Sequence, residues 1–498
     1  MTTFLSHAGR ALAAATAAGD DVLLTDDHES VTGVEFAAEV CRLAWTLADL
    51  GYGPGHTVGI AVGVTIRALA LRYAAGLAGC TTVFCPETPE LFAPFASMVR
   101  PELLVVAPEL AAAVPVGLRG RRAGWNAQGL LDLGELATLR PSSDFADRSR
   151  SDDIAVLVSS GGTSGRPKAS RRSFTSYLGL VGGPANPARR QLVCTPLTYV
   201  AQVLTDQALL GGGRVVLQQR FDPAAVLGAV ETHRITHLGL VEPLVARLVV
   251  HPDLTRRDLG SLVAVTHIGA TAPAPLRRRW LEALGPVLVN PYGSSECGIA
   301  TALAAPEYGP TDDARLASAG RALPGAEVRI ERADQTTAAP DECGRIVVRT
   351  LGSADGYVGE DAPIGAFRAG GWFATGDLGM LDQDGYLTVR GRAADERVIG
   401  GRTIMPIDLE DRLYAHPQVR YAAAVPLDRD PDHVFGIVVT VAPGSRLQAA
   451  DLQGWLARHD PALGASAIVL REFVPVTPQG KPDRARIAGL FIAREQAA

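Results

Sequence analysis

The sequence predicts an α/β protein with a large amino-terminal domain and a small α+β carboxy-terminal domain. Short apolar runs alternate with Ala- and Leu-rich helical stretches as far as Ile268. From about Gly320 the pattern changes to short strands and tight glycine turns, and mixed helices and strands follow Arg392. Alternation of strands and helices favours parallel strands joined by crossover helices. The chain of 498 residues is long enough for several domains, at roughly 150 residues per domain.

The expected elements follow in order along the chain. Strands are expected at residues 58–62, 80–86, 154–158, 192–194, 214–217, 236–241 and 261–268, then at 327–330 and 344–349, and finally at 422–425 and 436–441. The Ala-rich run at 11–18 lacks the basic segment and strong apolar core of a signal peptide, so we expect a helix. The large domain, of mixed sheets flanked by helices plus a β-rich subdomain, is placed at residues 1–391. The small domain is placed at residues 392–498.

Composition excludes several classes of protein. Hydrophobic residues make up 47% and charged residues 20%, which is typical of a globular protein. The net charge is −6 and there is no basic run, so nucleic acid is not an expected partner. No apolar stretch of about 18 residues is present, so no membrane partner is expected. The six cysteines form no CxxC pair, which argues against a zinc site or a disulfide framework and favours a cytoplasmic location.

Lysine is rare in this sequence. Of the 47 basic residues, only Lys168 and Lys481 are lysines. A lysine is a compact, rotatable point charge that the planar guanidinium of arginine does not reproduce. Both lysines are therefore candidates for a specific role, against the alternative that they remain by chance.

Lys168 ends a loop with the composition of a phosphate cradle. An apolar strand at 154–158 opens into Ser159-Ser160-Gly161-Gly162-Thr163-Ser164-Gly165-Arg166-Pro167-Lys168. Glycines expose backbone N–H groups, and the hydroxyls and the lysine add further groups that bind phosphate. The GxxxxGK[ST] spacing of a Walker A loop is absent. A surface linker is the alternative, but a linker needs neither the strand nor the lysine.

Six motifs in order resemble the ANL superfamily of adenylate-forming enzymes, over nearly the whole chain. They are the turn at 50–55 (LGYGPG), the glycine-rich loop ending at Lys168, Asn290-Pro291-Tyr292-Gly293-Ser294-Ser295-Glu296, Ala374-Thr375-Gly376-Asp377, the hinge motif from Gly391-Arg392 through Asp395, Gly400, Gly401 and Pro406, and Thr477-Pro478-Gln479-Gly480-Lys481. The resemblance implies that a carboxylate attacks the α-phosphate of ATP and that a thiol then captures the acyl-adenylate. It also implies that the small domain turns on the hinge.

The resemblance assigns roles to the motif residues. The expected ATP-binding residues are Ser160, Gly161, Gly162, Thr163, Ser164, Gly165 and Lys168 for the phosphates, Gly269, Ala270, Thr271, Asn290, Tyr292, Gly293 and Ser294 around the base, and Asp377 and Arg392 near the ribose. Glu296 would hold Mg²⁺, a hard cation that prefers oxygen ligands. Ser295 would contact the α-phosphate, and Lys481 would stabilise charge that builds in the transition state. The alternatives without a functional role are that Asp377 is an ordinary turn aspartate and that Lys481 is a solvated surface lysine.

Three departures from the family pattern bear on the hinge and on the substrate pocket. Ala394 stands where the family often has Asp or Lys. The family's PLFH segment reads Pro196-Leu197-Thr198-Tyr199, so the aromatic role passes to Tyr199. Glu242 ends the strand at 236–241, where relatives have proline, and a carboxylate there must be solvated or paired. We expect a pocket lined by four polar residues: Thr198, Tyr199, Gln202 and Glu242. The alternative for Glu242 is an ion pair with Arg247.

The leading hypothesis is a ligase that uses ATP and Mg²⁺ to activate a small polar or aromatic carboxylic acid. The acyl group would then pass to CoA or to a carrier-protein thiol. One alternative on the same scaffold is a diazotase that activates nitrite and joins it to an arylamine. A second alternative is a nucleotide sensor without turnover, which the presence of Glu296 and Lys481 disfavours.

Overall fold

Two large mixed sheets form most of the protein. The computed structural model describes residues 4–126, 129–160, 168–269, 272–308, 313–358, 365–428 and 433–492. Within these ranges the first sheet has the order β19 (Gly356–Tyr357), β9 (Lys168–Ser173), β8 (Ile154–Ser160), β4 (Thr81–Phe84), β3 (Thr57–Ala61), β5 (Leu103–Val106), β6 (Arg121–Gly124), β7 (Leu131–Asp132). The second has the order β16 (Arg321–Ala322), β15 (Gly298–Leu303), β14 (Leu288–Ser294), β13 (Ala264–His267), β12 (His237–Leu240), β10 (Arg190–Val193), β11 (Arg214–Leu217), β1 (Val22–Thr25), β2 (Ser30–Thr32).

The strands at the centre of both sheets are parallel, as the alternating sequence pattern predicts. In the first sheet β3, β4, β5, β6 and β8 pair in parallel, and in the second β10 to β14 do so. Antiparallel partners close one edge of the first sheet and both edges of the second. Ligand sites in open α/β sheets lie beyond the carboxyl ends of parallel strands. The glycine-rich loop after β8 and the segment after β13 both lie at such ends.

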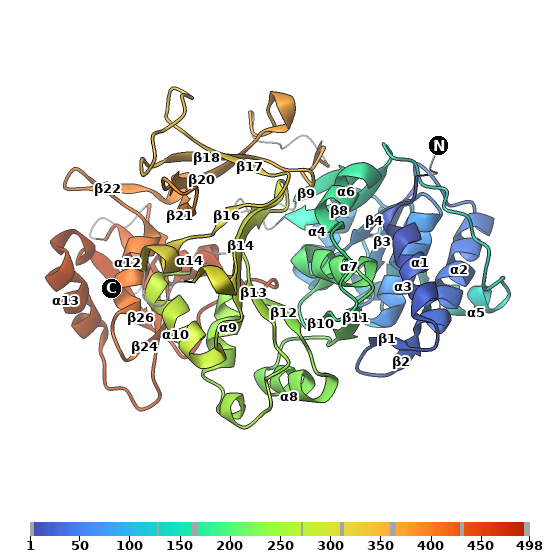
Figure 1. The fold of residues 1–498 in the computed structure, drawn as a ribbon, viewed down its shortest axis with the longest axis horizontal. Coiled ribbons are helices and arrows are strands. Elements are labelled where there is room, and N and C mark those ends of the chain that lie inside the picture. Colours follow the sequence, from blue (N-terminus) through green and yellow to red (C-terminus); the bar gives the residue numbers. More distant parts are fainter. Residues whose placement is uncertain are drawn as a thin grey trace.

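Helices cover the sheets and join them (Figure 1). They are α1 (His7–Ala18), α2 (Gly33–Asp49), α3 (Ile66–Leu77), α4 (Pro89–Val99), α5 (Leu133–Thr138), α6 (Phe174–Val181), α7 (Gln202–Leu210), α8 (Pro223–His233), α9 (Glu242–Val249), α10 (Ala274–Leu284) and α11 (Asp313–Ala317). Helices α1, α2, α3 and α7 share one buried core with strands of both sheets. That shared core holds the two sheets in a defined relation. The expected helix at 11–18 is the second half of α1.

A β-rich subdomain and a small α+β domain complete the fold. The subdomain is the sheet β17 (Glu327–Glu331), β18 (Gly344–Arg349), β20 (Phe373–Leu381), β21 (Leu387–Arg392). The small domain holds β22 (Arg397–Ile399), β23 (Arg402–Ile404), the sheet β24 (Val419–Pro426), β25 (Phe435–Val441), β26 (Ser466–Leu470), and helices α12 (Pro406–Tyr414), α13 (Ala449–His459) and α14 (Arg484–Ile492). The predicted fold class, with a large and a small domain, is confirmed.

The small domain packs directly on the large one. One buried apolar core contains Leu244 and Trp280 of the large domain together with Leu409 and Leu413 of α12. In Figure 1 the small domain, in orange and red, lies beside α9 and α10. This contact decides which residues of the small domain reach the site. In the part of the chain that the structure describes, no helix combines the length and the apolar character that a bilayer crossing requires.

Candidate functional site

Three predicted site residues, on β14, β20 and β21, lie together. The Tyr292 hydroxyl donates to Asp377 Oδ2 at 2.6 Å, and Asp377 Oδ1 forms an ion pair with Arg392 Nε at 3.1 Å. Arg392 also donates to the Thr375 carbonyl at 2.7 Å. Burial raises the pKa of Asp377, although Arg392 and Tyr292 act in the opposite direction. The structure thus brings together one aromatic ring, one carboxylate and one guanidinium from β14, β20 and β21.

The turn after β14 places Ser295 and Glu296 beside the strand that leads into the glycine-rich loop. Ser294 Oγ accepts from the backbone N–H groups of Glu296 and Cys297, which shapes the turn. The Ser295 carbonyl accepts from Ser170 Oγ at 2.7 Å, and Ser295 Oγ lies 3.5 Å from the Ser159 carbonyl. Ser295 is therefore held next to β8 and β9, between which the glycine-rich loop runs.

The Glu296 carboxylate has one hydrogen-bond partner that the sequence did not reveal. Glu296 Oε1 accepts from the Tyr357 hydroxyl at 2.7 Å. Tyr357 lies on β19, and no local pattern marks it as a site residue. Among the described residues, no three His, Cys, Asp or Glu side chains gather as a metal cluster. A single carboxylate fits Mg²⁺ that takes most of its other ligands from phosphates and water.

The glycine-rich loop itself lies outside the described residues. Gly161, Gly162, Thr163, Ser164 and Gly165 belong to it, and Ala270 and Thr271 also lie outside the described ranges. Ser160 ends β8 and pairs with Lys168, the first residue of β9. The strand pair on either side of the predicted phosphate cradle is thus present.

Lys481 reaches the site from the small domain. Its loop is a tight turn in which the N–H of Thr477 donates to the Lys481 carbonyl at 2.8 Å and the N–H of Gly480 donates to the Thr477 carbonyl at 2.8 Å. Gly480 has φ +83° and packs against Val241. A turn with this φ favours glycine. The lysine is therefore presented by a compact loop that rests on the large domain.

The Lys481 side chain lies against Gly269, just after β13. A Cβ on Gly269 would lie 2.4 Å from Lys481 Cε and 2.8 Å from Nζ, so the absence of a side chain makes room for the lysine. Burial and the Arg392 guanidinium lower the pKa of Lys481, whereas Glu296 and Asp377 act in the opposite direction. The cation is thus partly buried and lies in the field of two carboxylates. A buried cation can stabilise negative charge that develops during a reaction.

Tyr199 is the predicted pocket residue that touches the rest of the site. It lies in a π-helical segment (Leu197–Ala201) with non-helical φ −122° and ψ −141°. Burial raises the pKa of Tyr199, while hydrogen bonds of its hydroxyl with the side chains of Gln479 and Ser159 act in the opposite direction. Tyr199 therefore joins the end of β8 to the loop that carries Lys481. Gln479 was not predicted, although it lies two residues before Lys481.

Thr198 and Gln202 are buried and bonded within the protein. Thr198 Oγ1 donates to the Cys85 carbonyl at 3.2 Å, and Gln202 Nε2 donates to the Thr198 carbonyl at 3.3 Å. Gln202 Oε1 accepts from Arg72 at 3.5 Å. These side chains hold the segment that bears Tyr199.

Asn290 is likewise bonded within the protein. Its side chain bonds to His267 at 3.0 Å and to the Ser318 carbonyl at 2.9 Å. Both ends of its amide group are engaged, so the side chain supports β14.

The prediction that Glu242 lies in the pocket with Thr198, Tyr199 and Gln202 is wrong. Glu242 is the first residue of α9, is 4% exposed, and faces the small domain. Burial and the carboxylate of Glu410 raise the pKa of Glu242 well above its ordinary value, and a hydrogen bond with Tyr421 acts in the opposite direction. Glu242 lies at the first turn of a helix that packs against β24, and the buried contact between domains satisfies it there. Arg247 instead lies over the Phe221 ring at 5.2 Å.

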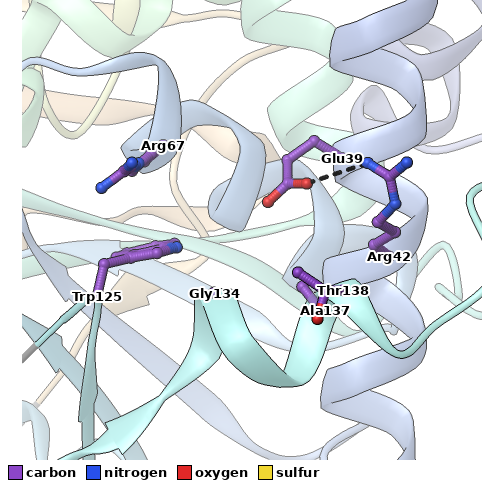
Figure 2. A pocket seen from close by; sticks show the side chains of 7 residues that line it. All are labelled: Glu39, Arg42, Arg67, Trp125, Gly134, Ala137 and Thr138. Atoms are coloured by element: carbon purple, nitrogen blue, oxygen red, sulfur yellow. Dashed lines mark hydrogen bonds and ion pairs between the residues drawn. The ribbon is translucent and has the colours of Figure 1, made fainter.

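A surface pocket of about 430 Å³ lies elsewhere, among α2, α3 and α5. Figure 2 shows Arg67 near the Trp125 ring on one side and the Glu39–Arg42 ion pair on the other. No predicted site residue lines it. This pocket is separate from the group around Lys481.

The fold and this group of side chains define an ATP-dependent, adenylate-forming enzyme of the acid–CoA ligase type. The chain belongs to the AMP-binding enzyme family, whose model matches residues 12–358. The resemblance to the ANL superfamily is thereby confirmed.

Two curated relatives are similar in sequence. A feruloyl-CoA synthase of Amycolatopsis sp. is 32% identical over 477 residues, which cover 91% of this chain and 92% of that protein. The medium/long-chain-fatty-acid–CoA ligase FadD8 of Mycobacterium tuberculosis is 31% identical over 377 residues. That match covers 72% of this chain and 65% of FadD8, which is less than two thirds of its length.

One solved structure is similar over almost the whole chain. The amide bond synthetase McbA of Marinactinospora thermotolerans is 28% identical with a TM-score of 0.85, and the match covers 97% of this chain and 100% of that one. These relatives give no support to the nitrite-activating alternative.

Proposed function

We propose that this protein transfers the AMP moiety of ATP to an aromatic or small polar carboxylic acid with release of pyrophosphate, and then transfers the acyl group from the acyl-adenylate to the thiol of CoA with release of AMP. The observation that carries the proposal is the position of Lys481, which lies against Gly269 in the field of Glu296 and Asp377. A partly buried cation at this place suits a reaction in which a carboxylate attacks a phosphate, since both reactants are anions. The feruloyl-CoA synthase, similar over 91% of the chain, supports an aromatic acid and CoA.

In this proposal each described residue has a task. Tyr292 offers its ring to adenine while Asp377 holds its hydroxyl, and Asp377 with Arg392 binds the ribose. Glu296 holds Mg²⁺, which shields the phosphate charge when it is bound. Ser295 donates a hydrogen bond to the α-phosphate, and Lys481 stabilises the charge that builds as the new bond forms.

A pyrophosphate-release screen tests the proposal. Purified protein with ATP and Mg²⁺ is given hydroxycinnamic, benzoic, aminobenzoic, short aliphatic and long-chain fatty acids, with and without CoA. We expect release with an aromatic acid and an acyl-CoA product by mass spectrometry when CoA is present. A preference for long-chain fatty acids, as the name of FadD8 suggests for that relative, would contradict the proposed acid class.

Amide formation is a second candidate, because the amide bond synthetase matches 97% of the chain. The same acyl-adenylate would then be attacked by an amine in place of a thiol. Adding an arylamine or alkylamine to the screen separates the two acceptors. An amide formed without CoA, at a higher kcat/KM than the thioester, would favour this candidate.

A further inference from the structure

Helix α10 of the large domain touches the carboxy-terminal end of α12 in the small domain. Arg279, on α10, donates three hydrogen bonds to backbone carbonyls across this boundary. Its Nη1 atom donates to the Val419 carbonyl at 2.5 Å, and its Nη2 atom donates to the carbonyls of Tyr414 at 2.6 Å and His416 at 3.1 Å. The acceptors lie 135 to 140 residues away along the chain.

One of the acceptors, the Tyr414 carbonyl, is of the kind that a helix leaves without a partner, while the His416 and Val419 carbonyls lie in the turn after α12 and at the start of β24. Helix α12 ends at Tyr414, and the last carbonyls of a helix have no N–H group of their own helix to accept from. A cation at this end also interacts favourably with the helix dipole. Arg279 therefore acts as a C-cap for α12, supplied by the other domain.

The contact lies in the same boundary that seats Lys481. Leu276 and Trp280, on either side of Arg279 along α10, share the apolar core with Leu413 and Tyr414 of α12. In the same boundary, Gly480 packs against Val241 and Leu244. Docking of α12 on α10 and docking of the lysine loop on α9 are thus parts of one arrangement of the two domains.

One other polar contact between the domains lies beside the expected hinge. Arg390, two residues before Arg392, bonds to Asp408 of α12 at 2.5 Å. Contacts next to a pivot change little when a domain turns about it. Arg279 instead holds the segment around the carboxy-terminal end of α12, and we expect a rotation of the small domain to separate it from these carbonyls.

We propose that Arg279 is a positioning residue for the adenylation step: it caps α12 across the domain boundary, holds Lys481 in the site, and releases α12 when the small domain turns. This inference rests on the proposed adenylation and on the expected hinge. It assigns Arg279 no contact with substrate. Loss of the cap is expected to slow the step that needs Lys481 and to spare the step that follows its departure.

The surroundings of Arg279 make it suitable for substitution. A surface pocket of about 330 Å³ borders Arg279, so water can reach the three carbonyls once the guanidinium is removed. Hydrated carbonyls cost less than buried, unpaired ones. We therefore expect the variants to fold.

The first test compares the two half-reactions in Arg279→Ala, Arg279→Lys and the wild type. Formation of the acyl-adenylate is followed in a single turnover with ATP and acid, and transfer is followed from isolated acyl-adenylate and CoA. We expect Arg279→Ala to slow adenylation by about tenfold or more, because it removes hydrogen bonds from a charged donor. The rate of transfer should stay within about twofold of the wild-type rate. Arg279→Lys keeps the charge and should recover part of the rate. Arg234→Ala is the matched control, because Arg234 pairs with Asp258 at the surface of the large domain alone.

The second test reads the domain arrangement without activity. Spin labels at the exposed positions Val263 and Phe473, in a Cys343→Ser background, report the distance between the domains. We expect Arg279→Ala to broaden or shift the distance distribution of the wild type, and Arg234→Ala to leave it unchanged. An unchanged distribution with an unchanged adenylation rate would overturn the inference, as would equal slowing of both half-reactions. Absence of acyl-adenylate in the wild type with every acid would instead overturn the proposed function.

Discussion

Lys481 is partly buried, and its environment lowers the pKa of its ammonium group. The turn from Thr477 to Lys481 presents the lysine side chain, and Gly269 leaves room for it because a side chain at position 269 would collide with the lysine. A preorganised charge of this kind contributes to the transition state more than to the bound substrate. Its loss is therefore expected to lower the rate much more than the affinity for ATP.

Replacing Lys481 by alanine tests this expectation directly. We expect acid-dependent pyrophosphate exchange to fall on the order of 10²-fold or more, while the Kd for ATP changes little. Exchange and equilibrium ATP binding are measured on the same preparation. An exchange rate close to that of the wild type would remove Lys481 from the catalytic step.

The pH profile of adenylation gives a second prediction for Lys481. The charged form is the one that stabilises the transition state, and burial favours the neutral form. The rate should therefore fall as the pH rises through a value below the ordinary lysine pKa of 10.5. The residual rate of Lys481→Ala, measured over the same pH range, should lack this decline.

Glu296 is expected to hold Mg²⁺ through its charge. Glu296→Gln keeps an oxygen that can accept from Tyr357 but loses the negative charge, so the concentration of Mg²⁺ needed for half-maximal activity should rise on the order of tenfold or more. Tyr357→Phe is the matched control, because it removes the hydrogen bond and keeps the carboxylate. A Mg²⁺ titration of Glu296→Gln that overlays the wild type would show that the cation is held elsewhere.

Among the elements, the short 3₁₀ turn at Ala393–Asp395 follows β21 and leads into the small domain. Arg392 before it bonds to Asp377, and Asp395 within it bonds to Arg484. The turn is thus held at one end by the large domain and at the other by the small one. Ala394 between them is exposed and brings no side-chain group that anchors the turn.

We expect Ala394→Pro to restrict this turn, because proline fixes its own φ and constrains the residue before it. Acyl transfer to CoA should slow by about tenfold, and more than adenylation, since transfer follows the rotation. Ala394→Gly, which adds freedom, is the control. The two half-reactions are measured separately, and equal slowing of both would place the pivot elsewhere.

At the scale of the whole molecule, two carboxyl groups lie together between the large and the small domain. Glu242 comes from α9 and Glu410 from α12, and Glu410 Oε1 accepts from the Ala424 N–H at 2.9 Å. Burial raises the pKa of Glu410 to about 7. The ordinary pKa of a glutamate is 4.5. Between pH 4.5 and about pH 7, Glu410 therefore keeps its proton in the folded protein and loses it in the unfolded chain.

This proton makes stability depend on pH. The stabilisation is fully present below pH 4.5 and is lost as the pH rises through about 7. The side chain of Glu410→Gln is neutral at every pH, so the variant should lack this dependence. The Tm of the variant minus the Tm of the wild type should therefore be about 2–4 °C larger at pH 8 than at pH 5. Glu472→Gln, an exposed change in the same domain, is the control. Parallel pH curves for Glu410→Gln and the wild type would contradict the prediction.

Local pattern in the sequence determined the strands, the order of the domains and the family. Strands β11 and β18 have the predicted bounds, at 214–217 and 344–349, and β8 runs from 154 into the start of the glycine-rich loop. Such runs are set by neighbours along the chain, since an apolar strand between turn residues carries its own signal. Short motifs led to site residues in the same way: Ala374-Thr375-Gly376-Asp377 led to Asp377, and the rarity of lysine together with Thr477-Pro478-Gln479-Gly480-Lys481 led to Lys481.

Only the tertiary structure decided which of these side chains meet and what else they touch. Glu242 follows a parallel strand as the sequence predicts, yet it faces Tyr421 and Glu410 of the small domain and not the pocket. Tyr357 holds Glu296 from 61 residues away, and Arg279 reaches carbonyls that are 135 to 140 residues distant. The partners of a buried polar group are fixed by the packing of elements that are remote in sequence, because burial makes an unpaired group costly wherever the chain brings it.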